Sequence, residues 1–380
     1  MHYVVIGNSA TGVGAAESIR AADPDAHITI IGDEAEHVYS RPLISHYIAG
    51  EVSADEMRYR PADFYTRLKV ETRLGIRADA IDVSAHAVTL ADGKSIHYDK
   101  LLIATGSIQK FPPIKGREYP GVFDFWTRAH ADAIRERTSG CDVQLPCTAI
   151  VVGAGLVGIQ AASGLRGAGL NVVLVELLPS ILSRILDTRA AACAQAIFEK
   201  HGVRVLTERS VKEILGSGEE GVTGVVLENG ERIDCGLIVK ATGVAPNLSL
   251  VKGTPIVTNM GIVVNEYFQT NIPDVFAAGD VAETYDVTRN KMFVNANWPN
   301  AHAQGRVAGL NMAGRAAAYN GSIGMTSMPL FGVPIVSVGI VEPEKGDEVR
   351  VRESSRKRAT RYACASRPRF IKSSSSARTA

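Results

Sequence analysis

The chain has 380 residues, of which 46% are hydrophobic and 21% are charged, and its formal net charge is +1. This length exceeds what a single hydrophobic core usually fills, so we expect two or three domains. No stretch approaches the ~20 consecutive apolar residues of a membrane-spanning helix, which excludes a protein built on such spans and indicates a soluble globular chain.

The small net charge conceals a basic C-terminal tail. Residues 345–380 contain eleven Lys or Arg and three Asp or Glu, which leaves 30 basic and 37 acidic residues in the first 344. Because a mildly acidic body attracts no phosphate backbone, we expect no nucleic-acid partner. The start of the chain lacks the pattern of a secretory signal, so we expect a cytoplasmic location.

The cysteines offer no metal site or disulfide framework. They stand singly and form no CxxC pair: Cys141, Cys147, Cys193, Cys235 and Cys364. This spacing predicts neither a zinc nor an iron–sulfur centre within the chain, and we assign no metal ligand.

The N-terminal segment has the pattern of a dinucleotide-binding βαβ unit. An apolar strand at 3–6 precedes the first glycine turn, GNSATG at 7–12, and an alanine-rich helix is expected to about residue 22. A second strand at 28–31 ends at Asp33 and Glu34, ~20 residues past the last glycine, where a carboxylate can accept hydrogen bonds from ribose. Ser9 replaces the middle glycine, and its small side chain is compatible with a nearby pyrophosphate.

A second unit of the same kind begins 146 residues later, and its glycine pattern is complete. A strand at 148–152 precedes the second glycine turn, GAGLVG at 153–158, a helix to about residue 167, and a strand at 171–175 that ends at Glu176. A carboxylate there accepts a hydrogen bond from the adenosine 2′-hydroxyl and repels a 2′-phosphate, which favours NAD(H) over NADP(H). Arg184 lies only a few residues after Glu176 and could turn toward a 2′-phosphate, so NADP(H) remains the alternative. A tandem repeat of one nucleotide domain is a further alternative.

Three later motifs separate the two halves. Strands ending in Ala-Thr-Gly occur in YDKLLIATG at 98–106 and IVKATGVAPN at 238–247, which is typical of a chain crossing between nucleotide domains. The segment TNIPDVFAAGD at 270–280 predicts a strand ending at Gly279 and Asp280, whose carboxylate can bond a ribitol hydroxyl. WPNA at 298–301 predicts the start of a helix to about residue 314, with Pro299 in its first turn.

This order of motifs resembles the pyridine nucleotide-disulfide oxidoreductase superfamily over residues 1 to about 340. The resemblance implies an α/β fold with two Rossmann-like three-layer ββα domains and a truncated α+β C-terminal interface domain. The FAD-binding domain is split, 1–113 and 245–320, by an inserted NAD-binding domain at 114–244. The strand-like stretch at 328–341 belongs to the start of the interface domain, 321–346, and 347–380 is a basic, low-complexity tail unlike the family's.

The resemblance also implies cofactors, FAD and NAD(H), and residues that hold them. For FAD these are Gly7, Ser9, Ala10, Thr11, Asp33, Glu34, Arg41, Pro42, Ala78, Ala104, Thr105, Gly106, Gly279, Asp280, Trp298 and Pro299. For NAD they are Gly153, Gly155, Leu156, Val157, Gly158, Glu176, Thr242 and Gly243. The helix that begins at Trp298 is implied to direct its N-terminus at the flavin, where its dipole stabilises negative charge.

The segment YSRPLISH at 39–46 narrows the chemistry. Thiol-dependent members carry a cysteine beside the flavin, whereas no cysteine precedes Cys141 here. The Arg41–Pro42 pattern is similar to the rubredoxin, ferredoxin and nitrite reductase-like branch, which implies that Arg41 binds the FAD pyrophosphate. Some members of that branch pair a lysine with a glutamate beside the flavin and nicotinamide, and motif alignment gives His46 and Gln160 at those positions. Because both charges are absent together, we infer that this site is neutral and that the joint replacement shifts the flavin potential or the binding of nicotinamide.

Longer strings resemble the FAD subunits of anaerobic multi-subunit dehydrogenases, such as phenylglyoxylate dehydrogenase and tungsten aldehyde oxidoreductase. They are GNSATGVGAAESIRAADPDA, YSRPLISHYIAG and WPNAHAQGRVAGLNMAG. The resemblance implies hydride exchange between NAD(H) and FAD, single-electron transfer with an iron–sulfur partner, and a hetero-oligomeric complex. The alternatives are a free-standing NADH-dependent rubredoxin or ferredoxin reductase and a catalytically silent flavin-fold binding or regulatory module.

Overall fold

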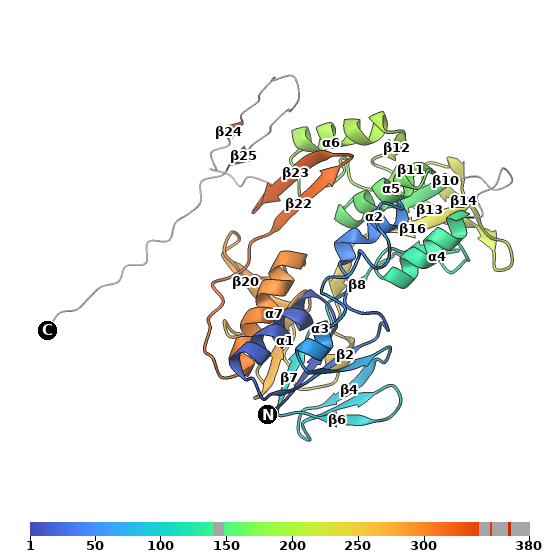
Figure 1. The fold of residues 1–380 in the computed structure, drawn as a ribbon. Helices are drawn as coiled ribbons and strands as arrows, with labels where there is room; N and C mark the ends of the chain where they lie inside the picture. Colours follow the sequence, from blue (N-terminus) through green and yellow to red (C-terminus); the bar gives the residue numbers. More distant parts are fainter. Residues whose placement is uncertain (140–147, 342–349, 352–363, 366–380) are drawn as a thin grey trace.

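The computed structural model describes residues 1–139 and 148–341, together with two short strands, β24 (Arg350–Val351) and β25 (Cys364–Ala365). Apart from these two strands, the predicted tail at 347–380 lies outside the described residues. Two lobes lie side by side, and each is built on a five-stranded parallel sheet (Figure 1). The α/β fold expected from the two βαβ patterns is therefore confirmed.

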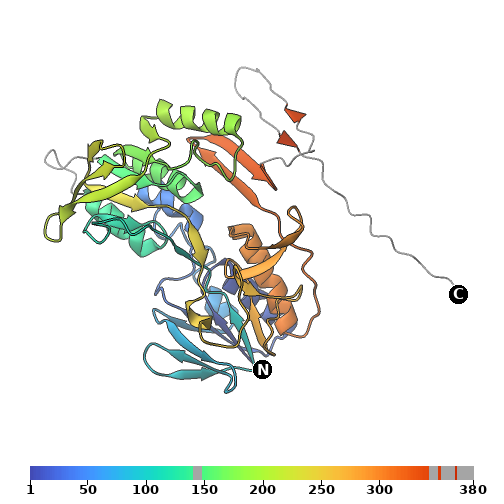
Figure 2. The same cartoon turned by 180° about the vertical axis from the view of Figure 1, so that it is seen from behind.

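The sheet of the first lobe has the strand order β19–β7–β1–β2–β3. In chain order the strands are β1 (His2–Ile6), β2 (His27–Gly32), β3 (Val70–Leu74), β7 (Lys100–Ile103) and β19 (Val275–Ala277). All four pairings are parallel. Because β19 follows the whole second lobe in the sequence, the first lobe is built from two separated segments (Figure 2).

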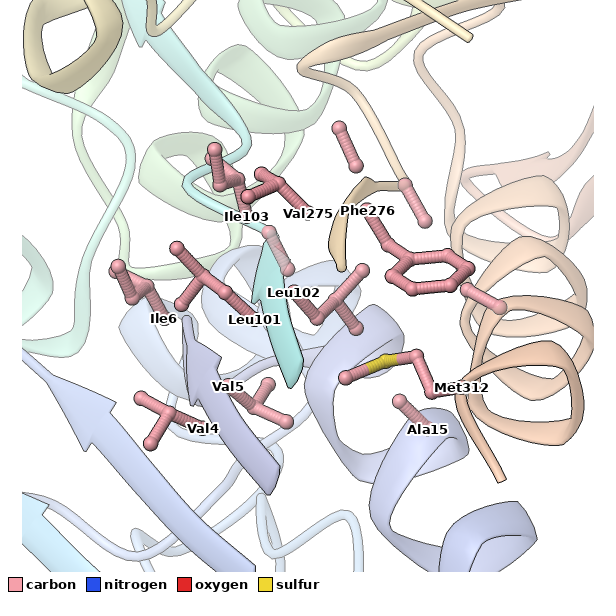
Figure 3. Close-up of a cluster of buried hydrophobic side chains, with 14 of the residues drawn as sticks. Val4, Val5, Ile6, Ala15, Leu101, Leu102, Ile103, Val275, Phe276 and Met312 are labelled. Atoms are coloured by element: carbon pink, nitrogen blue, oxygen red, sulfur yellow. The ribbon is translucent and has the colours of Figure 1, made fainter. Parts of the chain in front are cut away.

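Layers on both faces bury the apolar side chains of this sheet. Helices α1 (Ala10–Ala22) and α7 (Trp298–Met312) cover one face, and the antiparallel strands β4 (Ala78–Asp82), β5 (Ala87–Leu90) and β6 (Ser95–His97) cover the other. Figure 3 shows Val5, Leu102 and Phe276 on the side of Ala15 and Met312, which come from the two helices. Burial on both faces explains why these strands read as continuous apolar runs.

Glycines let α1 and α7 cross at close range. A Cβ at Gly305 would lie 2.1 Å from the carbonyl oxygen of Thr11, and one at Gly309 would lie 2.5 Å from that of Ala15. Both distances are shorter than real Cβ contacts allow, so the small residues of α7 serve packing against α1. This contact fixes the N-terminus of α7 above the first glycine turn.

The second lobe repeats the plan with the strand order β12–β11–β10–β16–β9. The strands are β9 (Val122–Asp124), β10 (Thr148–Val152), β11 (Asn171–Val175), β12 (Val203–Leu206) and β16 (Leu237–Lys240). Helices α4 (Arg128–Ser139), α5 (Leu156–Gly167) and α6 (Thr188–Lys200) pack on one face, and strands β13 (Val211–Ser217), β14 (Gly221–Leu227) and β15 (Arg232–Asp234) pack on the other. Along β10, Ala149 and Val151 face the helices, whereas Ile150 and Val152 face the antiparallel strands.

Shorter elements connect the lobes and complete the fold. The chain crosses between the lobes along β8 (Ser107–Gln109) and β17 (Val244–Pro246), which pair antiparallel. The others are η1 (Arg41–Leu43), α2 (Ile44–Ile48), α3 (Phe64–Arg67), η2 (Ser249–Val251), β18 (Ile262–Val263), β20 (Ala282–Asp286), β21 (Lys291–Phe293), β22 (Met325–Leu330) and β23 (Val333–Val338). The stretch expected to be strand-like at 328–341 is thus part of a hairpin, with its turn at Phe331 and Gly332.

One segment packs differently from the predicted domain plan. Residues 1–113 are expected to form one part of the FAD domain, yet the apolar side chains of residues 39–57 belong to the core of the second lobe: Tyr39, Ile44, Tyr47, Ile48 and Met57. Both views show α2 against the helices of that lobe (Figures 1 and 2). The physical reason is that α2 buries its apolar face between α4 and α5, a contact that sequence patterns do not reveal.

A buried carboxylate holds the segment before α7. Asp286 is fully buried and accepts hydrogen bonds from the side chains of Thr288 (2.6 Å), Arg289 (2.7 Å) and Asn295 (2.8 Å). Burial opposes its ionisation, but these hydrogen bonds outweigh burial and lower the pKa of Asp286 to about 2 from its usual 3.8. Asn295 also donates to the hydroxyl of Ser322 at 2.6 Å, so the network ties the chain before α7 to the linker after it.

We therefore predict that Asp286→Asn lowers the free energy of unfolding by about 2 kcal/mol at pH 7. Because the pKa is lower in the folded protein than in the unfolded chain, the contribution is complete above about pH 4 and is lost as the pH falls toward 2. Chemical denaturation of both proteins between pH 7 and pH 3 measures the difference, and the exposed Asp25→Asn is the control. A difference that does not change with pH would contradict this account.

Candidate functional site

Most of the predicted cofactor residues follow the carboxyl ends of the parallel strands. In the first lobe they follow β1, β2, β7 and β19, and in the second lobe they follow β10, β11 and β16. The carboxyl ends of parallel strands meet at one edge of a sheet, which is where ligands bind in open α/β sheets. Each sheet therefore has one candidate edge.

The first glycine turn is built by backbone contact. Gly7 has φ +130°, and a Cβ there would lie 2.2 Å from the carbonyl oxygen of Ala104; one at Gly12 would lie 1.9 Å from that of Gly7. Ser9 is the N-cap of α1, and its side chain makes no capping hydrogen bond. Ala10 and Thr11 form the first turn of α1, which contains no acidic residue. A helix N-terminus of this kind suits a pyrophosphate.

Gln304 of α7 and Ser107 of β8 each form a hydrogen bond with the Gly279–Asp280 motif. Gly279 has φ +81°, and its N–H donates to Oε1 of Gln304, a buried side chain of α7, at 2.8 Å. Asp280 Oδ2 accepts a hydrogen bond from Ser107 at 3.1 Å. Burial raises the pKa of Asp280, while the Ser107 hydrogen bond and the charge of Arg41 act in the opposite direction. Asp280 is half-buried, and its carboxylate has capacity for a ligand hydroxyl beside the hydrogen bond from Ser107.

The end of β2 carries a compact polar network. Asp33 is exposed, whereas Glu34 is half-buried and accepts hydrogen bonds from the hydroxyl of Tyr39 at 2.5 Å and from Arg41. Arg41 also donates to the carbonyl oxygen of Trp126 at 2.5 Å. Arg41 is therefore held between the carboxylate after β2 and the segment that leads into α4, and its remaining N–H groups could still donate to a pyrophosphate.

The other predicted FAD residues lie in several elements, and their assignment to FAD stays a prediction. Pro42 is in η1, Ala78 begins β4, and the hydroxyl of Thr105 donates to the carbonyl oxygen of Asn247 at 2.9 Å. Gly106, with φ +68°, has no atom within 4 Å of a would-be Cβ, so space is open beside the turn. Trp298 and Pro299 form the first turn of α7, with Asn297 as the N-cap.

The second glycine turn contains one glycine that faces open space. A Cβ at Gly153 would lie 2.4 Å from the carbonyl oxygen of Ala241, and one at Gly158 would lie 1.8 Å from that of Gly153. A Cβ at Gly155 meets nothing within 4 Å. Gly153 and Gly158 are thus needed for packing, whereas the space at Gly155 is available for the close approach of a nucleotide.

The remaining predicted NAD residues surround that space. Leu156 and Val157 begin α5, and Glu176 accepts from the N–H of Ala154 at 2.6 Å and from that of Leu178 at 2.8 Å. Glu176 therefore lies against the second glycine turn. The motif after β16 lies at the same edge: the hydroxyl of Thr242 donates to the carbonyl oxygen of Lys110 at 2.5 Å, and Gly243 has φ +109°.

The structure brings Ser45, not His46, to Gln160. The Ser45 hydroxyl donates to Oε1 of Gln160 at 2.9 Å, and Nε2 of Gln160 lies 3.4 Å from the sulfur of Met328. His46, in the middle of α2 and partly exposed, instead pairs with Glu51 at 2.5 Å. His46 therefore points away from Gln160, because consecutive helical residues point about 100° apart, and its assignment to the flavin and nicotinamide environment stays a prediction.

The sequence patterns did not identify three polar residues that form hydrogen bonds with predicted site residues: Ser45, Ser107 and Gln304. Gln304 had a signal, because its helical spacing groups it with Ala301 and Ala308, small residues of α7 that are buried with it. Ser45 and Ser107 had none, since each acquires its partner only through packing between distant segments.

Within residues 1–139 and 148–341, no group of three or more His, Cys, Asp or Glu could hold a metal ion, and no helix is long and apolar enough to cross a membrane. Of the cysteines, Cys235 is buried, Cys193 is half-buried, and both are outside disulfides; Cys141 and Cys147 lie outside the described residues. Burial raises the pKa of the Cys235 thiol to about 12, which makes it a poor nucleophile.

Comparisons with known proteins agree with this geometry. Residues 1–305 match the family described as pyridine nucleotide-disulphide oxidoreductase. The epsilon subunit of NADH-dependent phenylglyoxylate dehydrogenase from Aromatoleum evansii is 32% identical over 354 residues, which cover 92% of this chain and 82% of that protein. NADH-rubredoxin oxidoreductase from Clostridium acetobutylicum is 29% identical over 346 residues, 91% of this chain and 83% of the relative.

Solved structures share the whole architecture. A ferredoxin reductase from Rhodopseudomonas palustris has a TM-score of 0.86 and 27% identity, and the match covers 96% of this chain and 88% of that one. A NAD-dependent persulfide reductase from A. fulgidus has a TM-score of 0.85 and 26% identity, with 95% and 70% coverage.

Two alanine substitutions separate packing from nucleotide approach in the second glycine turn. Gly158→Ala is expected to destabilise the protein by more than about 3 kcal/mol, because the methyl group would overlap a backbone oxygen. Gly155→Ala is expected to leave stability within about 1 kcal/mol and to weaken NAD(H) binding at least about tenfold. Thermal unfolding and a calorimetric NAD⁺ titration measure both effects. Wild-type NAD⁺ affinity in Gly155→Ala would refute the assignment.

A double substitution tests the neutral contact between Ser45 and Gln160. Ser45→Lys with Gln160→Glu places an ion pair where the hydroxyl now bonds the amide, and we expect an altered flavin midpoint potential or a change of at least about threefold in the KM for NADH. The control is His46→Lys with Gln160→Glu, which places the lysine beside Glu51 and leaves the new glutamate unpaired. Unaltered potential and kinetics in the first double variant would rule out a role for the neutral pair.

Proposed function

The chain belongs to the pyridine nucleotide-disulphide oxidoreductase family, and from this premise we propose that it is the NAD-linked flavin subunit of a larger dehydrogenase, exchanging electrons with an iron–sulfur partner. It is an NAD(P)H-dependent oxidoreductase that uses FAD and NAD(H). The observation that carries the subunit assignment is the match to an epsilon subunit along 92% of this chain and 82% of that relative.

The residues at the two edges fit their cofactors. In the first lobe, the N-terminus of α1, Asp280 and the open space beside Gly106 would hold FAD. In the second lobe, the space at Gly155 and the carboxylate of Glu176 would hold NAD(H). When bound, these cofactors supply hydride exchange and the release of single electrons, while the chain orients them. We assign Glu176 a preference for NAD(H), because its carboxylate would repel a 2′-phosphate.

We assign the iron–sulfur centre to a partner, because the five cysteines stand singly in the sequence. The surface of the C-terminal hairpin supports a permanent partner over a transient carrier. Residues 316–341 contain no Lys, Arg, Asp or Glu, and one face of the hairpin exposes Met325, Val336 and Val338. Permanent interfaces are larger and more apolar than those of transient redox encounters, so an apolar, uncharged surface suits a resident subunit.

The free-standing reductase is the second candidate, and the NADH-rubredoxin oxidoreductase relative favours it. The two candidates differ in whether the protein works alone with a soluble carrier. Family membership and these relatives favour either over a silent binding module. The cytoplasmic location stays a prediction.

Purification from the native source under anaerobic conditions tests the proposal. We expect the chain to co-purify with additional subunits that contain iron and acid-labile sulfide. We expect NADH to bleach the flavin faster than NADPH does. Val336→Lys places a charge on the hairpin, and we expect this variant to purify without the other subunits. The control is Gly218→Ala, at an exposed turn of the second lobe. A lone chain that reduces rubredoxin or ferredoxin at a catalytic rate would establish the free-standing reductase instead.

A further inference from the structure

Helix α2 is wedged between two helices of the second lobe. On the α4 side, the hydroxyl of Tyr47 donates to Oδ1 of Asp132 at 2.5 Å, and the guanidinium of Arg135 lies 4.3 Å from the centre of the Tyr47 ring. Ile44 and Ile48 are buried in the same core. These contacts hold a short segment of the N-terminal lobe as if it belonged to the second lobe.

On the other side, α2 touches α5 at a separation that only glycine allows. A Cβ at Gly164 would lie 2.6 Å from the carbonyl oxygen of Ser45, and one at Gly167 would lie 2.8 Å from the Cβ of Ala49. Gln160, four residues before Gly164 on the same face of α5, receives the hydrogen bond from Ser45. Three positions of α5 therefore set how closely the two helices approach.

The chain continues directly from this contact to the first-lobe site. The N–H of Ile44 bonds the carbonyl oxygen of Arg41, so η1 and α2 form one continuous turn of chain. Arg41 reaches Glu34 at the end of β2 and the carbonyl oxygen of Trp126 before α4. A displacement of α2 away from α5 is thus transmitted to the residues at the edge of the first sheet.

We propose that α2 is the spacer that sets the separation of the two cofactor sites, and that Gly164 and Gly167 are positioning residues for hydride transfer between NAD(H) and FAD. The proposal deepens the proposed function and rests on its hydride exchange. Hydride transfer depends steeply on separation, since a misplacement of 1 Å can slow a reaction about a hundredfold. A methyl group at Gly167 moves α2 outward through Ala49, a residue to which we assign no cofactor, whereas one at Gly164 meets the backbone of Ser45.

The contact at Gly167 allows a test by rescue. Gly167→Ala brings its methyl group against that of Ala49, and Ala49→Gly removes the opposing methyl group, so the double variant restores the room. We expect flavin reduction by saturating NADH, followed by anaerobic stopped-flow absorbance, to slow at least about tenfold in Gly167→Ala and to return within about threefold of wild type in the double variant. Gly164→Ala meets backbone atoms of Ser45, so Ala49→Gly should not rescue it.

Amide hydrogen exchange supplies a readout without turnover. In the ligand-free protein, the amides of residues 45–51 are expected to exchange faster in Gly167→Ala and at the wild-type rate in the double variant. FAD content and reduction by dithionite should equal wild type in all variants, and Gly218→Ala is the matched control. The spacer role is overturned if Gly167→Ala reduces its flavin at the wild-type rate. It is also overturned if the double variant regains wild-type amide exchange but not the wild-type rate of flavin reduction. If NADH does not bleach the flavin of the wild-type protein, the proposed function itself is overturned.

Discussion

Backbone-to-backbone contact at two glycine turns is the constraint on which both sites depend. Gly7 lies against the carbonyl of Ala104, and Gly153 lies against that of Ala241, so the turns after β1 and β10 contact the ends of the neighbouring strands β7 and β16. No side chain fits between them. The helix that follows each turn therefore begins directly above the sheet edge, with its N–H groups directed at the space where a nucleotide would bind.

The parts of the fold that repeat locally could be predicted from the sequence. The helix after each glycine turn and the strands β10 and β11 lie where the pattern of glycine, apolar run and terminal carboxylate placed them, because hydrogen bonding and burial over a few residues determine them. The packing of α2 could not be predicted. Its five residues carry a short apolar pattern that fits either lobe, and the choice depends on glycines in α5 more than a hundred residues away.

The difference between local patterns and tertiary packing also explains which residues of the candidate site could be predicted from the sequence. Gly155 and Glu176 are found from spacing, because one βαβ unit brings them together. Ser45 is not found, since its partner Gln160 lies 115 residues away in the sequence and only tertiary packing brings the two side chains together. Arg41 is an intermediate case. Its position is readable, but its bonds to Glu34 and Trp126 come from tertiary packing, and they make it a link between the lobes as well as a candidate ligand for phosphate.

Neutrality at the contact between the lobes has a physical consequence for the proposed exchange. The bond between Ser45 and Gln160 joins uncharged groups, so it needs no compensating ion and its strength varies little with ionic strength or pH. An ion pair at the same place would add a local field to the space between the sites and would attract water. With a neutral bond and glycine contacts to α5, α2 sets a distance without adding a charge on that side, so the electrostatic influences at the first edge come from Asp280, the Glu34–Arg41 pair and the N-termini of α1 and α7.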